Sequence, residues 1–136
     1  MTAEHHGFDP SAYWERRLRP FDLSVVGHSG LGLRYKRWLY RVRAVVFRRL
    51  LRTISLPRDA RVLDVGSGTG FYIREWQRAG FTDIVGSDLT AVAVERLARR
   101  VPGVELVGWD AAVEPPFEPA SFAVISVDAS PFLGPA

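Results

Sequence analysis

A short apolar run leads directly into three alternating glycines, and this junction constrains the fold more than any other part of the sequence. The segment reads Val-Leu-Asp-Val-Gly-Ser-Gly-Thr-Gly over residues 62–70. Glycine tolerates left-handed backbone and permits close approach, and a helix N-terminus offers backbone N–H groups to a polar ligand. The segment therefore predicts a β-strand, a glycine loop and a helix that begins near residue 71.

After Pro57, short apolar runs alternate with stretches of helical periodicity. The predicted strands cover 61–65, 84–86, 104–107 and 122–127, and the predicted helices cover 71–79 and 91–100. Alternation at this spacing is typical of right-handed βαβ units around a parallel sheet. Gly80 and Gly103 come directly after the two helices, where a left-handed cap is usual. The fold class is therefore α/β.

The first part of the chain predicts helices. We expect a short helix over 11–18, with Ser11 as its cap, and a long one over 33–54. In the long segment, apolar residues recur with helical spacing at Tyr35, Leu39, Val42, Val46, Leu50 and Ile54, with Trp38 and Val45 in the same stripe. Such a stripe is expected to pack on the rest of the protein. We therefore divide the chain into an N-terminal helical segment, 1–56, and an α/β domain, 57–136.

Charge is divided unevenly between the two halves of the sequence. Residues 1–61 carry 13 basic and 5 acidic side chains, a balance of +8, whereas residues 62–136 carry 5 basic and 10 acidic ones, a balance of −5. A basic helix with an apolar stripe suits packing over a sheet, but it also suits binding to anionic lipid or nucleic acid. Packing is favoured. A non-catalytic interaction module that uses this helix stays open as the alternative function.

Composition excludes several classes of protein. The chain has 136 residues, of which 47% are hydrophobic and 24% charged, as in ordinary globular domains. It has no cysteine, which excludes disulfides, thiolate metal sites and a cysteine nucleophile. The three histidines show no ligand-like spacing, so no metal site is predicted. No apolar run is long enough to span a membrane, and no secretory signal is recognisable, so we predict a cytoplasmic protein.

The spacing of the glycine loop indicates which ligand it suits. A dinucleotide-binding G-x-G-x-x-G loop would place its third glycine where this chain has Phe71. Asp64 stands two residues before Gly66, and a carboxylate there would repel a pyrophosphate but attract an ammonium group. A cofactor that carries positive charge therefore fits better than a nicotinamide dinucleotide.

The segment Asp64-Val-Gly-Ser-Gly-Thr-Gly70 resembles the D-x-G-x-G-x-G first motif of class I S-adenosylmethionine-dependent methyltransferases, and the similarity covers residues 58–128. The resemblance implies a Rossmann-like open parallel sheet and S-adenosyl-L-methionine as cofactor. It implies that the glycine loop binds the cofactor and that Asp88 holds the ribose hydroxyls. The adenine would lie beside residues further along the chain. The implied cofactor-binding residues are Asp64, Gly66, Ser67, Gly68, Gly70, Asp88, Leu89, Asp110 and Ala111.

The strand pattern supports the same residues without the family. Asp64, Asp88, Asp110 and Asp128 each lie at or just beyond the carboxyl end of a predicted parallel strand, where open α/β sheets bind ligands. Simpler roles stay open for them. Asp88 could merely cap the helix from residue 90, and loop aspartates such as Asp110 and Asp128 are commonly solvated or turn-forming. Asp128 is nevertheless the one candidate for a catalytic base.

The resemblance also predicts where the sheet ends. Class I methyltransferases usually have seven strands in the order 3-2-1-4-5-7-6, so we expect the order 3-2-1-4 without strands 5 to 7, as in a truncated gene product. Strand four would then be an open edge, which favours self-association. The predicted function is the N-terminal cofactor-binding part of a methyltransferase, with a small-molecule acceptor and without nucleic acid. The aromatic residues Tyr13, Trp14, Tyr35 and Trp38 are expected either to form a lid over the cofactor or to lie in the core.

Overall fold

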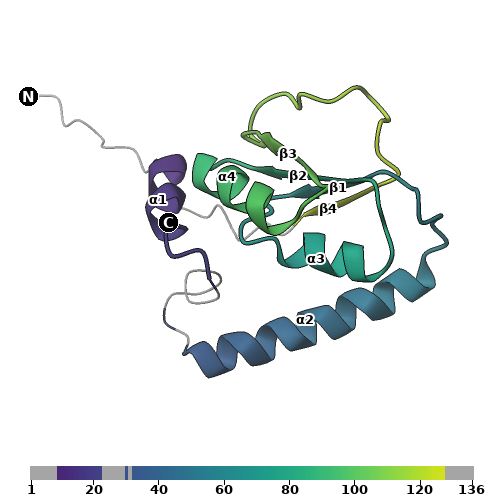
Figure 1. Ribbon diagram of the computed structural model, residues 1–136, viewed down its shortest axis with the longest axis horizontal. Helices are drawn as coiled ribbons and strands as arrows, with labels where there is room; N and C mark the ends of the chain where they lie inside the picture. The colour runs from purple at the N-terminus through teal and green to yellow at the C-terminus, as the bar shows by residue number, and fades with distance from the viewer. Residues whose placement is uncertain (1–8, 23–29, 31, 128–136) are drawn as a thin grey trace, which may run out of the picture.

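The computed structural model describes residues 9–22, 30 and 32–127 (Figure 1). Its elements in chain order are α1 (Pro10–Arg17), α2 (Leu33–Thr53), β1 (Val62–Val65), α3 (Phe71–Arg78), β2 (Ile84–Asp88), α4 (Ala91–Arg100), β3 (Glu105–Gly108) and β4 (Val124–Val127). Each predicted helix and strand is present within two residues of its expected bounds. The α/β prediction is confirmed.

The four strands form one parallel sheet in the order β3-β2-β1-β4, which confirms the predicted Rossmann-like arrangement. Val62 lies opposite Ile84 on one side and opposite Val124 on the other. These three residues share the sheet face that packs on α3 and α4, where the core includes Ile73 and Leu97. The edge strand β4 is more open than its neighbour β1. Val62, Leu63 and Asp64 of β1 are buried, whereas Ile125 and Val127 of β4 are exposed.

Two glycines end the crossover helices as predicted. Gly80 comes after α3 with φ 92°, and Gly103 comes after α4 with φ 82°. Both lie in the left-handed region that glycine adopts at low cost. At the other end of the chain, the predicted cap of α1 is wrong. Asp9, not Ser11, is the N-cap residue, and its Oδ1 accepts a hydrogen bond from the Ala12 N–H at 3.1 Å.

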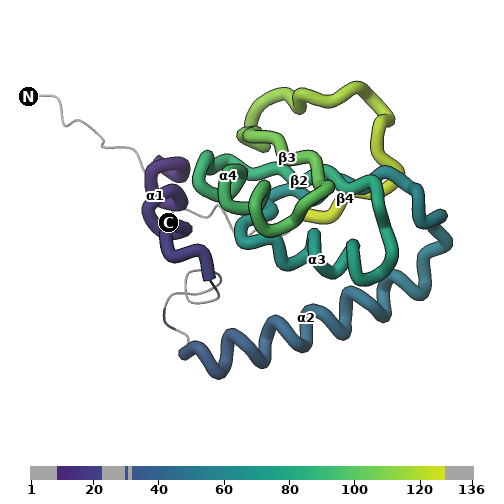
Figure 2. Tube along the Cα trace, in the orientation of Figure 1, coloured from purple at the N-terminus to yellow at the C-terminus, as the bar shows by residue number. Residues whose placement is uncertain are grey.

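Helix α2 lies outside α3 and forms a further layer of the molecule (Figure 2). The contact is aromatic. Tyr40 packs edge-on against Phe71 with ring centroids 4.8 Å apart, and Phe47 packs edge-on against Trp76 at 5.0 Å. One ion pair adds to these rings, because Arg48 Nε lies 2.9 Å from a carboxylate oxygen of the buried Glu75. Helix α2 is therefore attached to the domain through α3.

The predicted packing face of α2 is wrong. The buried residues are Lys36, Tyr40, Ala44 and Phe47, whereas the stripe expected to pack is largely exposed, with Trp38 at 56% and Val46 at 58%. The helix has two apolar faces, and only one of them meets α3. Apolar spacing identifies a helix, but it does not determine which apolar face finds the larger partner. Core burial is wrong for Tyr35 and Trp38 as well, since both rings are exposed and lie 5.6 Å apart, and their role as a lid over the cofactor stays a prediction.

The described residues include no helix that is long and apolar enough to cross a membrane. The division of the chain at residues 56 and 57 stays a prediction.

Candidate functional site

Three glycines form the loop between β1 and α3. Gly66, Gly68 and Gly70 have φ values of 73°, 50° and 83°, a region where a Cβ crowds the backbone. Gly70 is the most constrained, because a Cβ on it would lie 2.5 Å from Cδ2 of Leu97 on α4. Its N–H donates to the Ser67 carbonyl at 2.7 Å, which closes a tight turn. The geometry of the loop therefore requires the glycines that the sequence predicts there.

Asp88 ends β2 and joins the glycine loop to the start of α4. Its Oδ2 accepts a hydrogen bond from the Gly68 N–H at 2.8 Å. Its Oδ1 accepts from the N–H and the hydroxyl of Thr90, at 2.9 Å and 2.8 Å. Thr90 is itself the N-cap of α4, since its side chain accepts from the Ala93 N–H. Asp88 therefore supports the cap rather than forming it, and two predicted site residues, Asp88 and Gly68, are in direct contact.

Asp64 lies beneath the loop and is almost fully buried, at 1% exposure. The hydroxyl of Ser126, on β4, donates to Asp64 Oδ1 at 2.7 Å. The indole Nε1–H of Trp76, on α3, donates in turn to Ser126 Oγ at 3.1 Å. These bonds tie the acid to two other elements, and the Ser67 hydroxyl donates to the Asp64 carbonyl at 3.0 Å. Asp64 thus holds the base of the loop through the protein's own groups, and contact with a ligand stays a prediction.

The remaining predicted residues lie beside β2 and β3. Leu89 is half-buried directly after Asp88. Asp110 and Ala111 are exposed, and Asp110 Oδ1 accepts from the Ala112 N–H at 2.9 Å. This bond makes Asp110 a turn-forming residue, which is one of the simpler roles open to it. The Trp109 N–H donates to the Asp88 carbonyl at 3.0 Å, so the turn stands next to the end of β2. Asp128 lies outside the described residues.

Three residues that matter to the site are not predicted from the sequence. Gly86, inside β2, leaves no room for a side chain, since a Cβ would lie 2.7 Å from Ile73 Cδ1 and 2.9 Å from Ser67 Oγ. A glycine inside a strand often marks such a close approach, so this residue does carry a signal in the sequence. Ser126 carries no comparable signal, because its partner Asp64 is 62 residues away.

Arg74 is the third such residue, and it clamps the loop from α3. Its guanidinium Nη1 donates to the Thr69 carbonyl at 3.0 Å. Burial lowers the pKa of Arg74, the positive charges of Arg78 and Arg100 lower it further, and Glu75 opposes them. Nothing in the spacing of the sequence distinguishes Arg74 from the other arginines.

The assembled site combines backbone donors and carboxylates at the carboxyl ends of β1 and β2. The N-cap residue of α3 is Gly70, which has no side chain to cap the helix, so the helix begins directly from the glycine loop with its positive dipole end there. Carboxylates accept hydroxyl groups and attract cations, whereas loop N–H groups donate. Among the residues that the structure describes, no group of three or more acidic or histidine side chains is arranged to hold a metal ion. The site suits a ligand with hydroxyl groups and positive charge.

Comparison with known proteins points to the same region of the chain. A family model described as a methyltransferase domain matches residues 62–133, which is more than half of the chain and includes all four strands. The matched segment contains the glycine loop and Asp88. A search of curated proteins finds no match.

Proposed function

The chain belongs to the methyltransferase-domain family, and from this we propose that it is the cofactor-binding part of a class I enzyme that methylates a small-molecule acceptor from S-adenosylmethionine. One observation carries the proposal. The Asp88 carboxylate meets the Gly68 N–H at 2.8 Å, so the strand-end acid and the glycine loop form one continuous polar surface. Ligands of open α/β sheets bind at this end of the strands.

The donors and acceptors of this surface fit the proposed cofactor. S-adenosylmethionine supplies a ribose with two neighbouring hydroxyls, an adenine, and a methyl group on a positively charged sulfur. A carboxylate has about four acceptor positions, and Asp88 uses three of them within the protein. We propose that Asp88 exchanges the Gly68 N–H for ribose hydroxyls and keeps Thr90, because the Thr90 bonds hold the α4 cap.

The other residues are proposed to act around Asp88. Leu89 supplies an apolar side chain for one face of the adenine, and Asp110 with Ala111 borders its amino group. Asp64 keeps the loop in shape from below, and its negative charge favours a cationic ligand. Asp128 stays the candidate base if the acceptor must lose a proton. A chain without cysteine fits a reducing compartment, and we propose that the reaction takes place in the cytoplasm.

Methyl transfer from a sulfonium ion starts from an activated donor. Placing the acceptor in line with the methyl group therefore supplies much of the acceleration. In this proposal the protein's task is to fix the cofactor through the loop and Asp88.

Calorimetric titration with S-adenosylhomocysteine tests the proposal, after circular dichroism has established that the chain is folded. We expect micromolar binding to the unaltered chain and none to NAD. Asp88→Asn keeps the size of the side chain but loses one charged acceptor, so binding should weaken by about ten- to a hundredfold.

The matched control is Asp59→Asn, the same change at an exposed position before β1. It should leave the affinity unchanged. A folded chain that does not bind S-adenosylhomocysteine would contradict the cofactor assignment. Equal affinity of the Asp88→Asn variant would leave the cofactor in place but remove the ribose role of Asp88.

A further inference from the structure

Helix α2 carries a second apolar face that no described part of the protein covers. Its large exposed side chains are Tyr35, Trp38, Val42, Val45, Val46 and Leu50, each between 38% and 58% exposed. The buried residues Tyr40, Ala44 and Phe47 lie on the other side of the same helix, toward α3. We call these six exposed residues the outer stripe. Contiguous apolar surface of this kind usually marks an interaction site.

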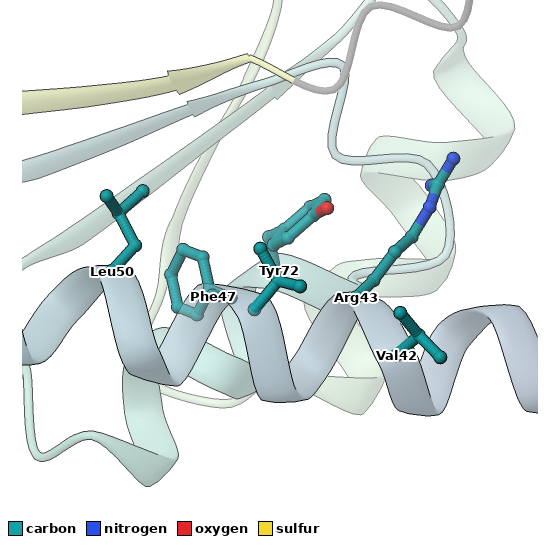
Figure 3. A pocket seen from close by; sticks show the side chains of 6 residues that line it. Val42, Arg43, Phe47, Leu50 and Tyr72 are labelled. Atoms are coloured by element: carbon teal, nitrogen blue, oxygen red, sulfur yellow. The ribbon is translucent and has the colours of Figure 1, made fainter.

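A shallow groove continues the outer stripe toward α3 (Figure 3). It is lined by Val42, Arg43, Val46, Phe47, Leu50 and Tyr72. Most of this lining is hydrocarbon, and Tyr72 belongs to α3 while the other residues belong to α2. The apolar surface is therefore not confined to one row of side chains.

Cations border the outer stripe, and α2 contains no acid to balance them. The 21 residues of α2 include eight lysines and arginines. Arg34, Arg37, Arg41, Arg48 and Arg52 succeed one another at helical spacings of three, four, seven and four, so they form a ridge along one side of the stripe. Arg48 pairs with Glu75, whereas the other four are exposed and form no ion pair with an acid among the described residues.

We propose that α2 binds the surface of an anionic lipid bilayer, with the outer stripe inserted among the headgroups and the arginine ridge on lipid phosphates. A helix in this position has a cationic polar side and large apolar residues on the other. A helix of 21 residues is about 31 Å long, so it offers an extended line of contact. Trp38 and Tyr35, near one end, are of the kind that settles at the boundary between lipid and water.

The chemistry of the stripe favours lipid over nucleic acid. Arginines alone would suit phosphates of either source, but a nucleic acid backbone offers no apolar surface to cover valines and leucines. The charge of α2 also disfavours a second copy of the chain. Two α2 helices that met through their outer stripes would bring two arginine ridges close together, each with four exposed arginines that form no ion pair among the described residues.

The test is sedimentation of the full chain with vesicles of phosphatidylcholine, with and without phosphatidylglycerol. We expect binding only to the vesicles with the anionic lipid, and weaker binding at higher salt. Arg37 and Arg41 are both exposed, and each cation near an anionic lipid surface strengthens binding by about five- to sixfold. The double variant Arg37→Gln with Arg41→Gln should therefore weaken binding by roughly thirtyfold. Val46→Asp, in the outer stripe, should weaken it at least about tenfold.

A matched control makes the same change on another helix. Arg96→Gln with Arg99→Gln alters two exposed arginines of α4 and should bind vesicles as the unaltered chain does. The two α2 arginines are exposed, so their variant keeps the test decisive even if Val46→Asp unfolds. S-adenosylhomocysteine binding should be the same in all of these variants, which separates this proposal from the proposed function.

Three outcomes would overturn the proposal. One is sedimentation with both kinds of vesicle, or with neither. Another is tighter binding to duplex DNA than to anionic vesicles, which would assign the ridge to nucleic acid. The last is a dimer in solution that Val46→Asp converts to a monomer, which would assign the outer stripe to a second copy.

Discussion

The sheet region and α2 are both rich in apolar residues but use them in different ways. In β1, neighbouring residues that point to opposite faces of the sheet are both buried, as Val62 and Leu63 are at 0% and 3% exposure. Helix α2 buries one face on α3 and leaves the outer stripe exposed. The inner strand β1 therefore uses its apolar residues for the core, whereas Ile125 and Val127 of the edge strand β4 stay exposed, at 57% and 61%. In α2 only part of the apolar surface serves stability, and the rest is available for a partner.

The same contrast appears in charge. The one buried acid that faces α2 among the described residues, Glu75, is paired with Arg48 from α2 and with Arg78 from its own helix. The other four arginines of the ridge form no such pair within the part of the chain that the structure describes. Of the five arginines in the ridge, only Arg48 is neutralised by an acid of the described protein. The positive charge of the other four is therefore available to a ligand with negative charge.

The largest expected effect tests which face of α2 serves stability. Phe47→Ala removes a ring that packs between Tyr72 and Trp76, so it should lower the free energy of unfolding by about 3 to 5 kcal/mol. Val46→Ala, one residue away in the outer stripe and 58% exposed, should change it by no more than about 0.5 kcal/mol. Urea denaturation followed by circular dichroism measures both. Similar losses in the two variants would contradict the contrast between the faces.

A smaller effect is expected in the glycine loop. Gly70→Ala places a methyl group 2.5 Å from Leu97 Cδ2 at a φ of 83°, so we expect a loss of about 2 to 4 kcal/mol from strain and overpacking. Gly103→Ala has a similar φ of 82° but nothing within 4 Å of the new atom. This variant should lose only about 1 to 2 kcal/mol of stability, because the alanine is strained in the left-handed region but meets no other atom. Equal losses in the two variants, measured by urea denaturation, would show that contact with α4 does not constrain the loop.

The smallest effect concerns the bond between β4 and the loop. Ser126→Ala removes the hydroxyl that donates to Asp64 and accepts from Trp76, and should cost about 1 to 3 kcal/mol because a buried carboxylate loses a donor. In Ser121 the hydroxyl is buried and has no hydrogen-bond partner in the part of the chain that the structure describes. Ser121→Ala should therefore be neutral or stabilising in thermal unfolding. If instead Ser121→Ala costs as much as Ser126→Ala, the Asp64 bond adds no stability of its own.

Local pattern was enough to predict most of the sheet region. Strand and helix periods, the glycines and the order of elements depend on residues close together in the chain, as at Gly70, where turn and helix start coincide. The acid at the end of β2 was predicted for the same reason, because parallel strands bring their carboxyl ends to one edge. The positions of the candidate site residues were therefore predictable where topology alone aligns them.

The features that the sequence did not predict depend on contacts between side chains that are far apart in the chain. The face of α2 was mispredicted because the choice between its two apolar faces depends on Phe71, Tyr72 and Trp76 of α3, whose rings receive Tyr40 and Phe47. The Ser126–Asp64 bond and the Arg74 clamp likewise join residues through space. Periodicity indicates that a surface is apolar or polar, but it does not identify the matching surface.

The bond from Ser126 to Asp64 has a consequence for how the protein is made. Asp64 leaves the ribosome 62 residues before its partner, and chains emerge in sequence order during synthesis at about 5 to 20 residues per second. Until β4 has emerged and paired with β1, the carboxylate under the glycine loop lacks this donor, and burying it would carry a desolvation cost. The loop of the nascent chain therefore reaches its final stability only after β4 has been synthesised.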